Sequence, residues 1–405
     1  MKKLSLILLL VCLSFTLFAQ TDVRSYGMGG THITDTSDFY TIDRNPAGLG
    51  FTSKHNLWTN LQVDVNGPLK DIIDASKDLI LNTEEDDSKN TSEENKESEA
   101  ESSDDKENKA TEELTNLVMD LVKQNNGLFT GINIVGPINF GFIKNGFGLK
   151  FSENIKFNLD VASVQNAQIK VVANTDLTIA YGHKIDLGAH DIGLGVSASL
   201  YTSPINVGIQ DSLVNIMNLV TSEEDEKTED QIPMDIIYGY GFDIGLQYRF
   251  ANNFTFGAVL KDVGTKYICK VEDNKFNFDK DKAVKQKLEP TLAVGFGVKI
   301  PTEYSFGLIT SWTAYADYDN VFNLLPKNKE KLARNPLLGL SAGTEVVLFK
   351  TIALRAGINE SYLSAGLGVK LAAFHIDFAL FGTERSLEPG LKPQMNAAFS
   401  VSFHN

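Results

Sequence analysis

Cysteine is almost absent from this 405-residue chain, and its scarcity limits how the fold can be stabilised. The two cysteines are Cys12 and Cys269, and Cys12 lies in an N-terminal segment with the pattern of a cleaved export signal. Removal of that segment leaves Cys269 alone, which excludes an intramolecular disulfide. Stability must therefore come from backbone pairing and side-chain packing.

Long hydrophobic runs are equally scarce. The clearest run, residues 4–18, follows two lysines and is shorter than the roughly 20 residues that a transmembrane helix needs. We therefore expect residues 1–19 to be a secretory signal peptide cleaved after Ala19. A lipoprotein signal at Cys12 is an alternative, although Val11 stands where that signal has a small residue.

Positive charge is in deficit, with 37 Lys and Arg against 52 Asp and Glu and a formal net charge of −15. This balance disfavours nucleic acid as a partner. Much of the excess is local, because residues 82–113 contain fourteen acidic residues against four lysines. That segment has almost no apolar residue, so we expect a disordered acidic loop. The six histidines show no metal-ligand spacing, and we expect neither a metal nor a cofactor.

Alternating apolar and polar residues fill most of the remaining chain and predict β-strands with one apolar face. The clearest case is 238–250, where large apolar residues alternate with Gly, Asp, Gln and Arg. A soluble sandwich is the alternative, but several strands reach ten residues and aromatic residues gather near their ends. We predict an all-β fold, a transmembrane antiparallel up-and-down β-barrel of about fourteen strands over residues 55–405.

The connections between these strands alternate in length. Long connections follow the first, fifth, seventh, ninth and thirteenth predicted strands, at residues 66–127, 203–234, 264–287, 319–334 and 384–393. Short connections lie between them, as at Asn145-Gly146, a strong hairpin signal. In an up-and-down barrel every second connection lies on the same rim, so we expect the long loops on the extracellular side.

Two amphipathic helices are predicted on either side of the acidic loop, over residues 69–81 and 114–122. They would place short helices in an extracellular loop. Their apolar faces could form an entry groove, or the helices could pack on each other and cover the barrel mouth.

Residues 20–54 form a separate unit between the signal peptide and the first strand. Gly27, Gly29 and Gly30 permit tight turns and positive φ. A short helix is predicted with its N-cap at Thr36 or Ser37, ending before the Asn45-Pro46-Ala47 motif because proline disfavours a helical residue before it. The unit is too small to hold a core of its own, so it must pack inside something else.

This pattern carries a resemblance to a known family. The segment Gly27-Met28-Gly29-Gly30 followed by Asn45-Pro46-Ala47-Gly48-Leu49 resembles the N-terminal hatch of the FadL-type outer-membrane transporters. The resemblance implies a fourteen-stranded barrel in the outer membrane, in contact with its lipid, with residues 20–54 inside the lumen. It also implies passive transport of hydrophobic, fatty-acid-like small molecules. The alternative is a non-transporting barrel that binds a protein partner, like the PorV-type relatives that act in secretion.

Charged residues on the polar faces of the predicted strands are candidates for contacts inside the lumen. They are Asp243, Arg249, Lys261, Lys299, Asp317, Glu345, Arg355, Lys370 and Asp377. Charges of both signs could hold the hatch through charge-assisted hydrogen bonds. They could equally line a water-filled pore.

A catalytic role finds little support in the sequence. Residues 339–343 match the pattern G-x-S-x-G, but Ser341 lies inside an alternating strand and not in the strand-turn-helix elbow that exposes a nucleophile. No nucleophile, base and orienting acid can be assembled, and we expect the protein not to be an enzyme.

Overall fold

The computed structural model describes residues 22–36, 38–52, 56–68, 116, 118–124, 127–136, 138–216, 235–271, 284–305, 307–325 and 334–404. The predicted signal peptide at 1–19, the acidic loop at 82–113 and the helix at 69–81 lie outside these residues.

The described chain is dominated by one antiparallel sheet of seventeen strands. In chain order they are β1 (Asn56–Asn66), β2 (Leu128–Val135), β3 (Phe140–Lys144), β4 (Phe147–Ser163), β5 (Asn166–Asp186), β6 (His190–Asp211), β7 (Asp235–Phe250), β8 (Phe254–Lys261), β9 (Lys266–Val271), β10 (Val284–Lys287), β11 (Thr291–Lys299), β12 (Ile309–Tyr318), β13 (Leu340–Leu348), β14 (Ile352–Asn359), β15 (Tyr362–Leu371), β16 (Phe374–Glu384) and β17 (Pro393–His404).

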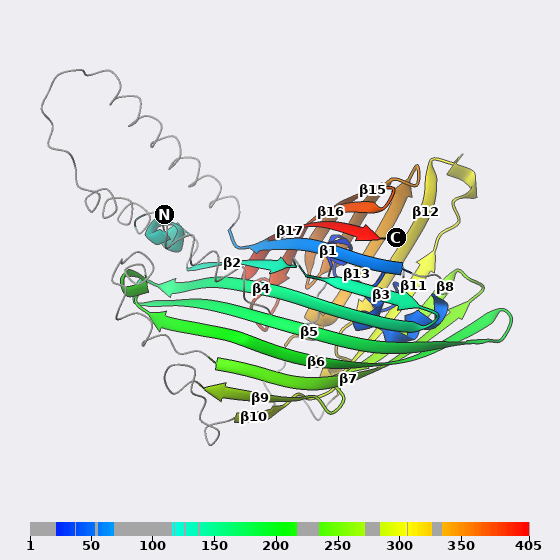
Figure 1. Ribbon diagram of the computed structural model, residues 1–405. Coiled ribbons are helices and arrows are strands. Elements are labelled where there is room, and N and C mark those ends of the chain that lie inside the picture. Colours follow the sequence, from blue (N-terminus) through cyan, green and yellow to red (C-terminus); the bar gives the residue numbers. More distant parts are fainter. Residues whose placement is uncertain are drawn as a thin grey trace, which may run out of the picture.

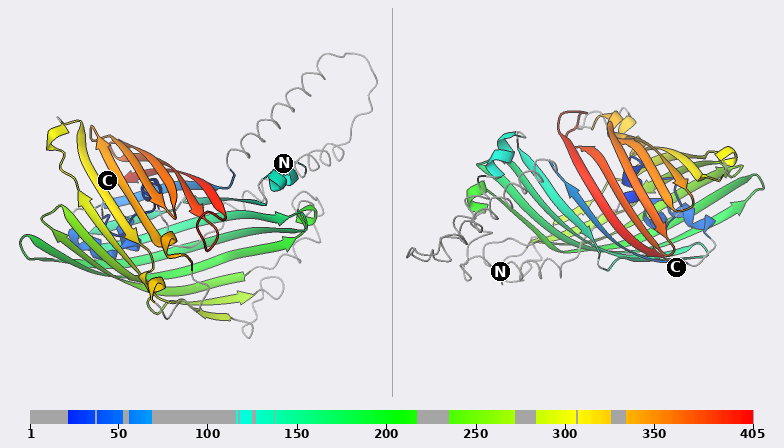
Figure 2. Two further views of the ribbon diagram at one scale, coloured as in Figure 1. Left: turned by 180° about the vertical axis from the view of Figure 1, so that it is seen from behind. Right: turned by 90° about the horizontal axis from the view of Figure 1, so that it is seen from above.

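These strands form a closed barrel of fourteen wall positions. Three positions each hold two strands end to end: β2 and β3 lie along β1 and β4, β8 and β9 lie along β7, and β10 and β11 lie along β9 and β8. The ring closes because β17 pairs with β1, for example Leu61 with Val401 (Figures 1 and 2). The predicted fourteen-stranded antiparallel barrel is confirmed.

The order of long and short connections follows the predicted parity. Residues 67–127, 212–234, 272–283, 319–339 and 385–392 separate wall strands at one rim, which we call the long-loop rim. The other rim carries short turns, including 145–146, 251–253 and 349–351, and we call it the short-turn rim. Two connections of the long-loop rim, 164–165 and 360–361, are as short as those opposite.

Several predicted boundaries were wrong. β6 continues to Asp211, well past the predicted end near residue 203, and β9 and β10 occupy much of the loop predicted over 264–287. In the β6 extension the alternation continues, with Ile205, Val207 and Ile209 separated by polar residues and glycine, so the sequence already carried a strand signal there. β9 and β10 are short and contain four lysines, which hid their strand character. β12 begins at Ile309, after the 3₁₀ helix η2 (Glu303–Ser305) in the connection from β11.

The two faces of the wall differ as the alternation predicts. On β7, Phe242, Ile244 and Leu246 are between 45% and 50% exposed on the outer face, whereas Gln247 is completely buried on the inner face. Large apolar side chains cover the outside of most other strands in the same way. An apolar exterior around a closed, fully paired sheet is what a bilayer-spanning barrel requires, since lipid offers backbone groups no partners.

The wall is much taller on one side than on the other. β5 and β6 have 21 and 22 residues, while β14 has 8. A membrane-spanning strand needs about 9–11 residues, so β4–β6 extend beyond the bilayer at the long-loop rim. An apolar cluster covers this extension, formed by Leu128, Val161 and Ala167 with residues of two helical turns at 118–124 and 213–216.

The second predicted amphipathic helix therefore exists over 118–124, and its face of Val118, Leu121 and Val122 is buried. Val161 lies on the same face of β4 as the exposed Phe147 and Phe157, so the helix packs on the outer face of the wall. The apolar face of this helix thus neither forms an open groove nor covers the barrel mouth.

Candidate functional site

The N-terminal segment, here residues 22–36 and 38–52, lies inside the ring of strands (Figures 1 and 2). It contains α2 (Val23–Gly27), α3 (Thr41–Arg44) and the 3₁₀ helix η1 (Pro46–Phe51). α2 contacts β14–β17, α3 contacts β4 and β5, and η1 contacts β5–β7. The segment therefore reaches opposite sides of the wall.

Apolar anchors hold the segment against the wall. Phe39, Ile42 and Leu49 are almost completely buried and form a cluster with wall residues that include Trp58 and Ile143. On the other side, the ring of Tyr26 stacks on Phe381 with centroids 4.1 Å apart, and this stacked pair packs against Val23. The segment thus finds in the lumen the core that it is too small to form alone.

Glycines allow the segment and the wall to approach closely. Gly29 and Gly30 have φ of 70° and 80°, a region that side chains disfavour. A Cβ atom on Gly357 of β14 would lie 2.4 Å from the nitrogen of Gly29, and one on Gly27 would lie 2.9 Å from the Cα of Gly366. Substitution at either interface would force the two backbones apart.

The Asn45-Pro46-Ala47 motif forms a cap that also contacts the wall. Asn45 is extended, with φ −153° and ψ 100°, and its Oδ1 accepts a hydrogen bond from the nitrogen of Ala47. Its Nδ2 donates to the carbonyl of Ile33 at 3.2 Å and to that of Leu246 in β7 at 3.1 Å. One side chain therefore joins two parts of the segment to the barrel.

The helix in this segment starts later than the sequence predicts. α3 begins at Thr41 with Tyr40 at its N-cap, so the predicted N-cap at Thr36 or Ser37 was wrong. The Thr36 hydroxyl instead accepts a hydrogen bond from Nη2 of Arg249 at 2.6 Å. Ser37 lies outside the described residues.

A chain of buried ion pairs links α2 to the wall. Arg24 donates through Nε and Nη2 to the two carboxylate oxygens of Glu345, at 2.8 and 2.9 Å, and also pairs with Asp35. Glu345 accepts a further bond from Nε of Arg355 at 2.7 Å, and Arg355 donates to Asp377 at 2.6 Å. Two-pronged contacts of this kind between arginine and carboxylate are among the stronger polar interactions in proteins.

A second group of charges lies within the segment. Arg44 pairs with Asp22, Asp35 and Asp38, and Lys150 of β4 pairs with Asp43. Burial, followed by the neighbouring Asp35 carboxylate, raises the pKa of Asp38 to about 7, although Arg24 acts in the opposite direction.

The structure places the predicted lumen charges in different surroundings. Glu345, Arg355 and Asp377 belong to the chain of ion pairs, and Asp317 accepts from the backbone nitrogens of His32 and Ile33. The other members touch the segment less directly or not at all. Arg249 contacts Thr36 and lies over the ring of Phe51. Asp243 accepts hydrogen bonds from the Ser197 hydroxyl and from the nitrogen of Asp262. Lys261 is on the inner face of β8, and Lys299 and Lys370 line cavities.

Sequence reasoning missed several of these polar contacts. Arg24, Asp35 and Arg44 lie within residues 20–54, the unit that the sequence predicts. Glu345, which pairs with Arg24, is more than three hundred residues away, and the pairs of Arg24 and Arg44 with Asp35 depend on the irregular path of the segment. Lys150 could have been found, because it alternates with Phe147, Leu149 and Phe151 and thus faces the lumen.

One wall position is interrupted beside the N-terminal segment. The break between β2 and β3 contains Gly136, with φ of 106°, and Asn139. The Asn139 side chain donates to Asn60 of β1, and Asn60 donates to the hydroxyl of Tyr40 in the segment. A line of hydrogen bonds therefore connects the segment to the interrupted wall.

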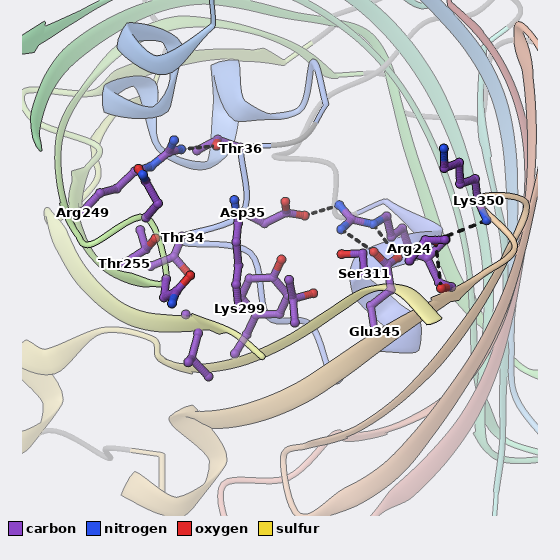
Figure 3. A pocket seen from close by; sticks show the side chains of 18 of the residues that line it. Arg24, Thr34, Asp35, Thr36, Arg249, Thr255, Lys299, Ser311, Glu345 and Lys350 are labelled. Carbon is purple, nitrogen blue, oxygen red and sulfur yellow. Dashed lines mark hydrogen bonds and ion pairs between the residues drawn. The ribbon is translucent and has the colours of Figure 1, made fainter. Parts of the chain in front are cut away.

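Cavities lie at both ends of the barrel. Near the short-turn rim, a cavity of about 540 Å³ is lined by residues that include Arg249, Lys299 and Glu345 (Figure 3). A second cavity near this rim, of about 350 Å³, is lined by residues that include Trp58, His375 and His404. At the long-loop rim a larger cavity of about 1070 Å³ is lined by Phe129, Tyr362, Leu363, Leu391 and Met395, with Arg385 and Lys392 beside them.

The G-x-S-x-G pattern at residues 339–343 does not form a nucleophile elbow. Ser341 is buried on β13, paired in register with Asp317 and Asn359, and is not at a turn. No group of three or more His, Cys, Asp or Glu that could hold a metal ion is found among the described residues. No helix in the described part of the chain is long and apolar enough to span a membrane.

No protein-family model and no curated protein matches the chain. Among solved structures, it is similar to the toluene transporter TodX of Pseudomonas putida, with 11% identity, 96% of this chain and 98% of the other covered, and a TM-score of 0.46. The monoaromatic hydrocarbon channel CymD is 12% identical, with 96% of this chain and 97% of the other covered and a TM-score of 0.47. A FadL homologue of Pseudomonas aeruginosa is 10% identical, with 96% of this chain and 99% of the other covered and a TM-score of 0.44. This FadL homologue belongs to the family that the glycine and Asn-Pro-Ala motifs of this chain resemble.

Proposed function

We propose that the protein is a passive outer-membrane transporter for hydrophobic small molecules. The observation that carries this proposal is the cavity of about 1070 Å³ at the long-loop rim, lined by Phe129, Leu363, Leu391 and Met395. Leu391, in the connection between β16 and β17, is 69% exposed and gives the cavity an apolar surface that a hydrophobic ligand would cover. Leu363 is on the outer face of β15 with Leu367, so its exposure is explained by contact with lipid. Arg385 and Lys392 beside this surface suit a fatty-acid-like molecule with an acidic head.

The N-terminal segment acts in this proposal as a hatch that closes the lumen. Its apolar anchors, the Asn45 cap and the ion pairs of Arg24 hold it across the barrel. The polar contacts can exchange for water when the segment moves, whereas the wall keeps its backbone pairing. In this proposal transport is passive and follows the concentration difference of the substrate.

The exit path is proposed to run through the wall. Below the hatch, the two cavities near the short-turn rim are lined largely by charged and polar groups, which an apolar substrate would leave desolvated at a cost. The break between β2 and β3 offers a lateral route into the bilayer, where an apolar molecule is favoured. The line from Tyr40 through Asn60 to Asn139 would couple movement of the hatch to opening of this break.

Uptake of labelled oleate and toluene by cells that express the chain tests the proposal. We expect Leu391→Ser to reduce uptake several-fold, because it removes apolar surface from the cavity. Leu337→Ser is the matched control, since Leu337 is 60% exposed at the same rim but does not line the cavity. Equal uptake by wild type, both variants and cells without the protein would refute transport.

The alternative is a non-transporting barrel that binds a protein partner. Purification in mild detergent followed by mass spectrometry separates the two functions, since co-purified acyl or aromatic molecules support transport. A stoichiometric protein partner without any such ligand supports the alternative.

A further inference from the structure

The cavity of about 540 Å³ near the short-turn rim carries an excess of positive charge. Its lining includes five basic side chains, Arg24, Arg249, Lys299, Lys350 and Lys370, against two carboxylates, Asp35 and Glu345. Both carboxylates pair with Arg24. Within the described residues, the other four basic side chains lie in no ion pair.

The basic side chains lie on more than one side of this cavity. Figure 3 shows Arg24 beside Glu345 on one side, Arg249 with Thr34 and Thr255 on the other, and Asp35 and Lys299 between them. Arg249 is fixed by its bond to Thr36 and by its position 3.7 Å over the ring of Phe51, and neither contact neutralises its charge. A preorganised cation therefore faces the same space as Lys299.

From these features we propose that the cavity binds a small hydrophilic oxyanion of the phosphate type, held by Arg249 and Lys299. The ligand is hydrophilic because few large apolar side chains line the cavity, unlike the one at the opposite rim. A liquid-like water occupies about 30 Å³, so the cavity has room for such an anion with part of its hydration shell. The site is separate from the proposed hydrophobic route and does not depend on it.

Equilibrium dialysis of the full-length protein in nonionic detergent against labelled inorganic phosphate tests this site, with ionic strength held constant by chloride. We expect saturable binding of one phosphate per barrel. Lys299→Gln should lower the affinity about tenfold, because it removes one hydrogen bond to a charged ligand.

Lys144→Gln is the matched control. Lys144 is exposed near a short turn of the same rim, does not line the cavity, and its replacement makes the same change in net charge. Heat-modifiable migration on a gel confirms that each variant remains folded. Absence of saturable binding by the wild type, or an equal loss with Lys144→Gln, would overturn the proposal.

Discussion

Replacing Arg24 by glutamine should release the N-terminal segment from the wall without unfolding the barrel. The side chains of Arg24 and Glu345 are only 14% and 7% exposed, and Arg24 also neutralises Asp35. Removing one partner of a buried ion pair costs about 3–5 kcal/mol when the remaining charge has no other partner. Glu345 keeps its bond from Arg355, and Asp35 keeps Arg44, so the docked state should lose about 3 kcal/mol relative to the undocked state, a shift of roughly 10²-fold in the docking equilibrium.

Single-channel recording in planar bilayers measures this shift directly. The wild type should be closed most of the time, and Arg24→Gln should open frequently. Arg334→Gln is the control, since Arg334 pairs with Glu360 at the long-loop rim, is 36% exposed, and such exposed pairs contribute about 0–1 kcal/mol. If both variants leave the recordings unchanged while the gel shows folded barrels, the ion pairs do not hold the segment.

Three further predictions concern the same segment and the acidic loop. Since the pKa of Asp38 is raised from 3.8 to about 7 in the docked segment, docking is strongest below pH 4 and weakens as pH rises towards 7. Conductance should therefore increase between about pH 4 and pH 7, and Asp38→Asn should remove this dependence. Replacing Asn45 and Pro46 with alanine should increase channel openings while heat-modifiable migration stays normal, because the cap to β7 is lost. Deletion of residues 84–111 should leave the folded band on such a gel, since their composition offers no apolar surface to bury.

The barrel could be predicted from sequence because its two faces obey a period of two. Gln247 between Leu246 and Tyr248 already indicated which side chains point inward, and β7 follows that pattern throughout. The long connections identified one rim for the same reason. The pattern failed in β9 and β10, because these strands are short and contain four lysines.

The contacts inside the lumen were only partly predictable. Alternation placed Glu345 and Arg355 on the inner face, but it could not show that Arg24 would bind between Asp35 and Glu345, since the segment has no repeating geometry. The motif at Asn45 indicated a turn, whereas its bond to Leu246 depends on how the segment is docked. Long-range polar contacts of an irregular segment have no local sequence signal.

The central claim is that the N-terminal segment closes the barrel, and deletion of residues 22–50 tests it most directly. The wall strands pair without this segment, so the shortened protein should still show the heat-modifiable folded band. In planar bilayers the intact protein should conduct little, and the deletion variant should conduct ions steadily. Equal conductance by the two folded proteins would contradict the claim.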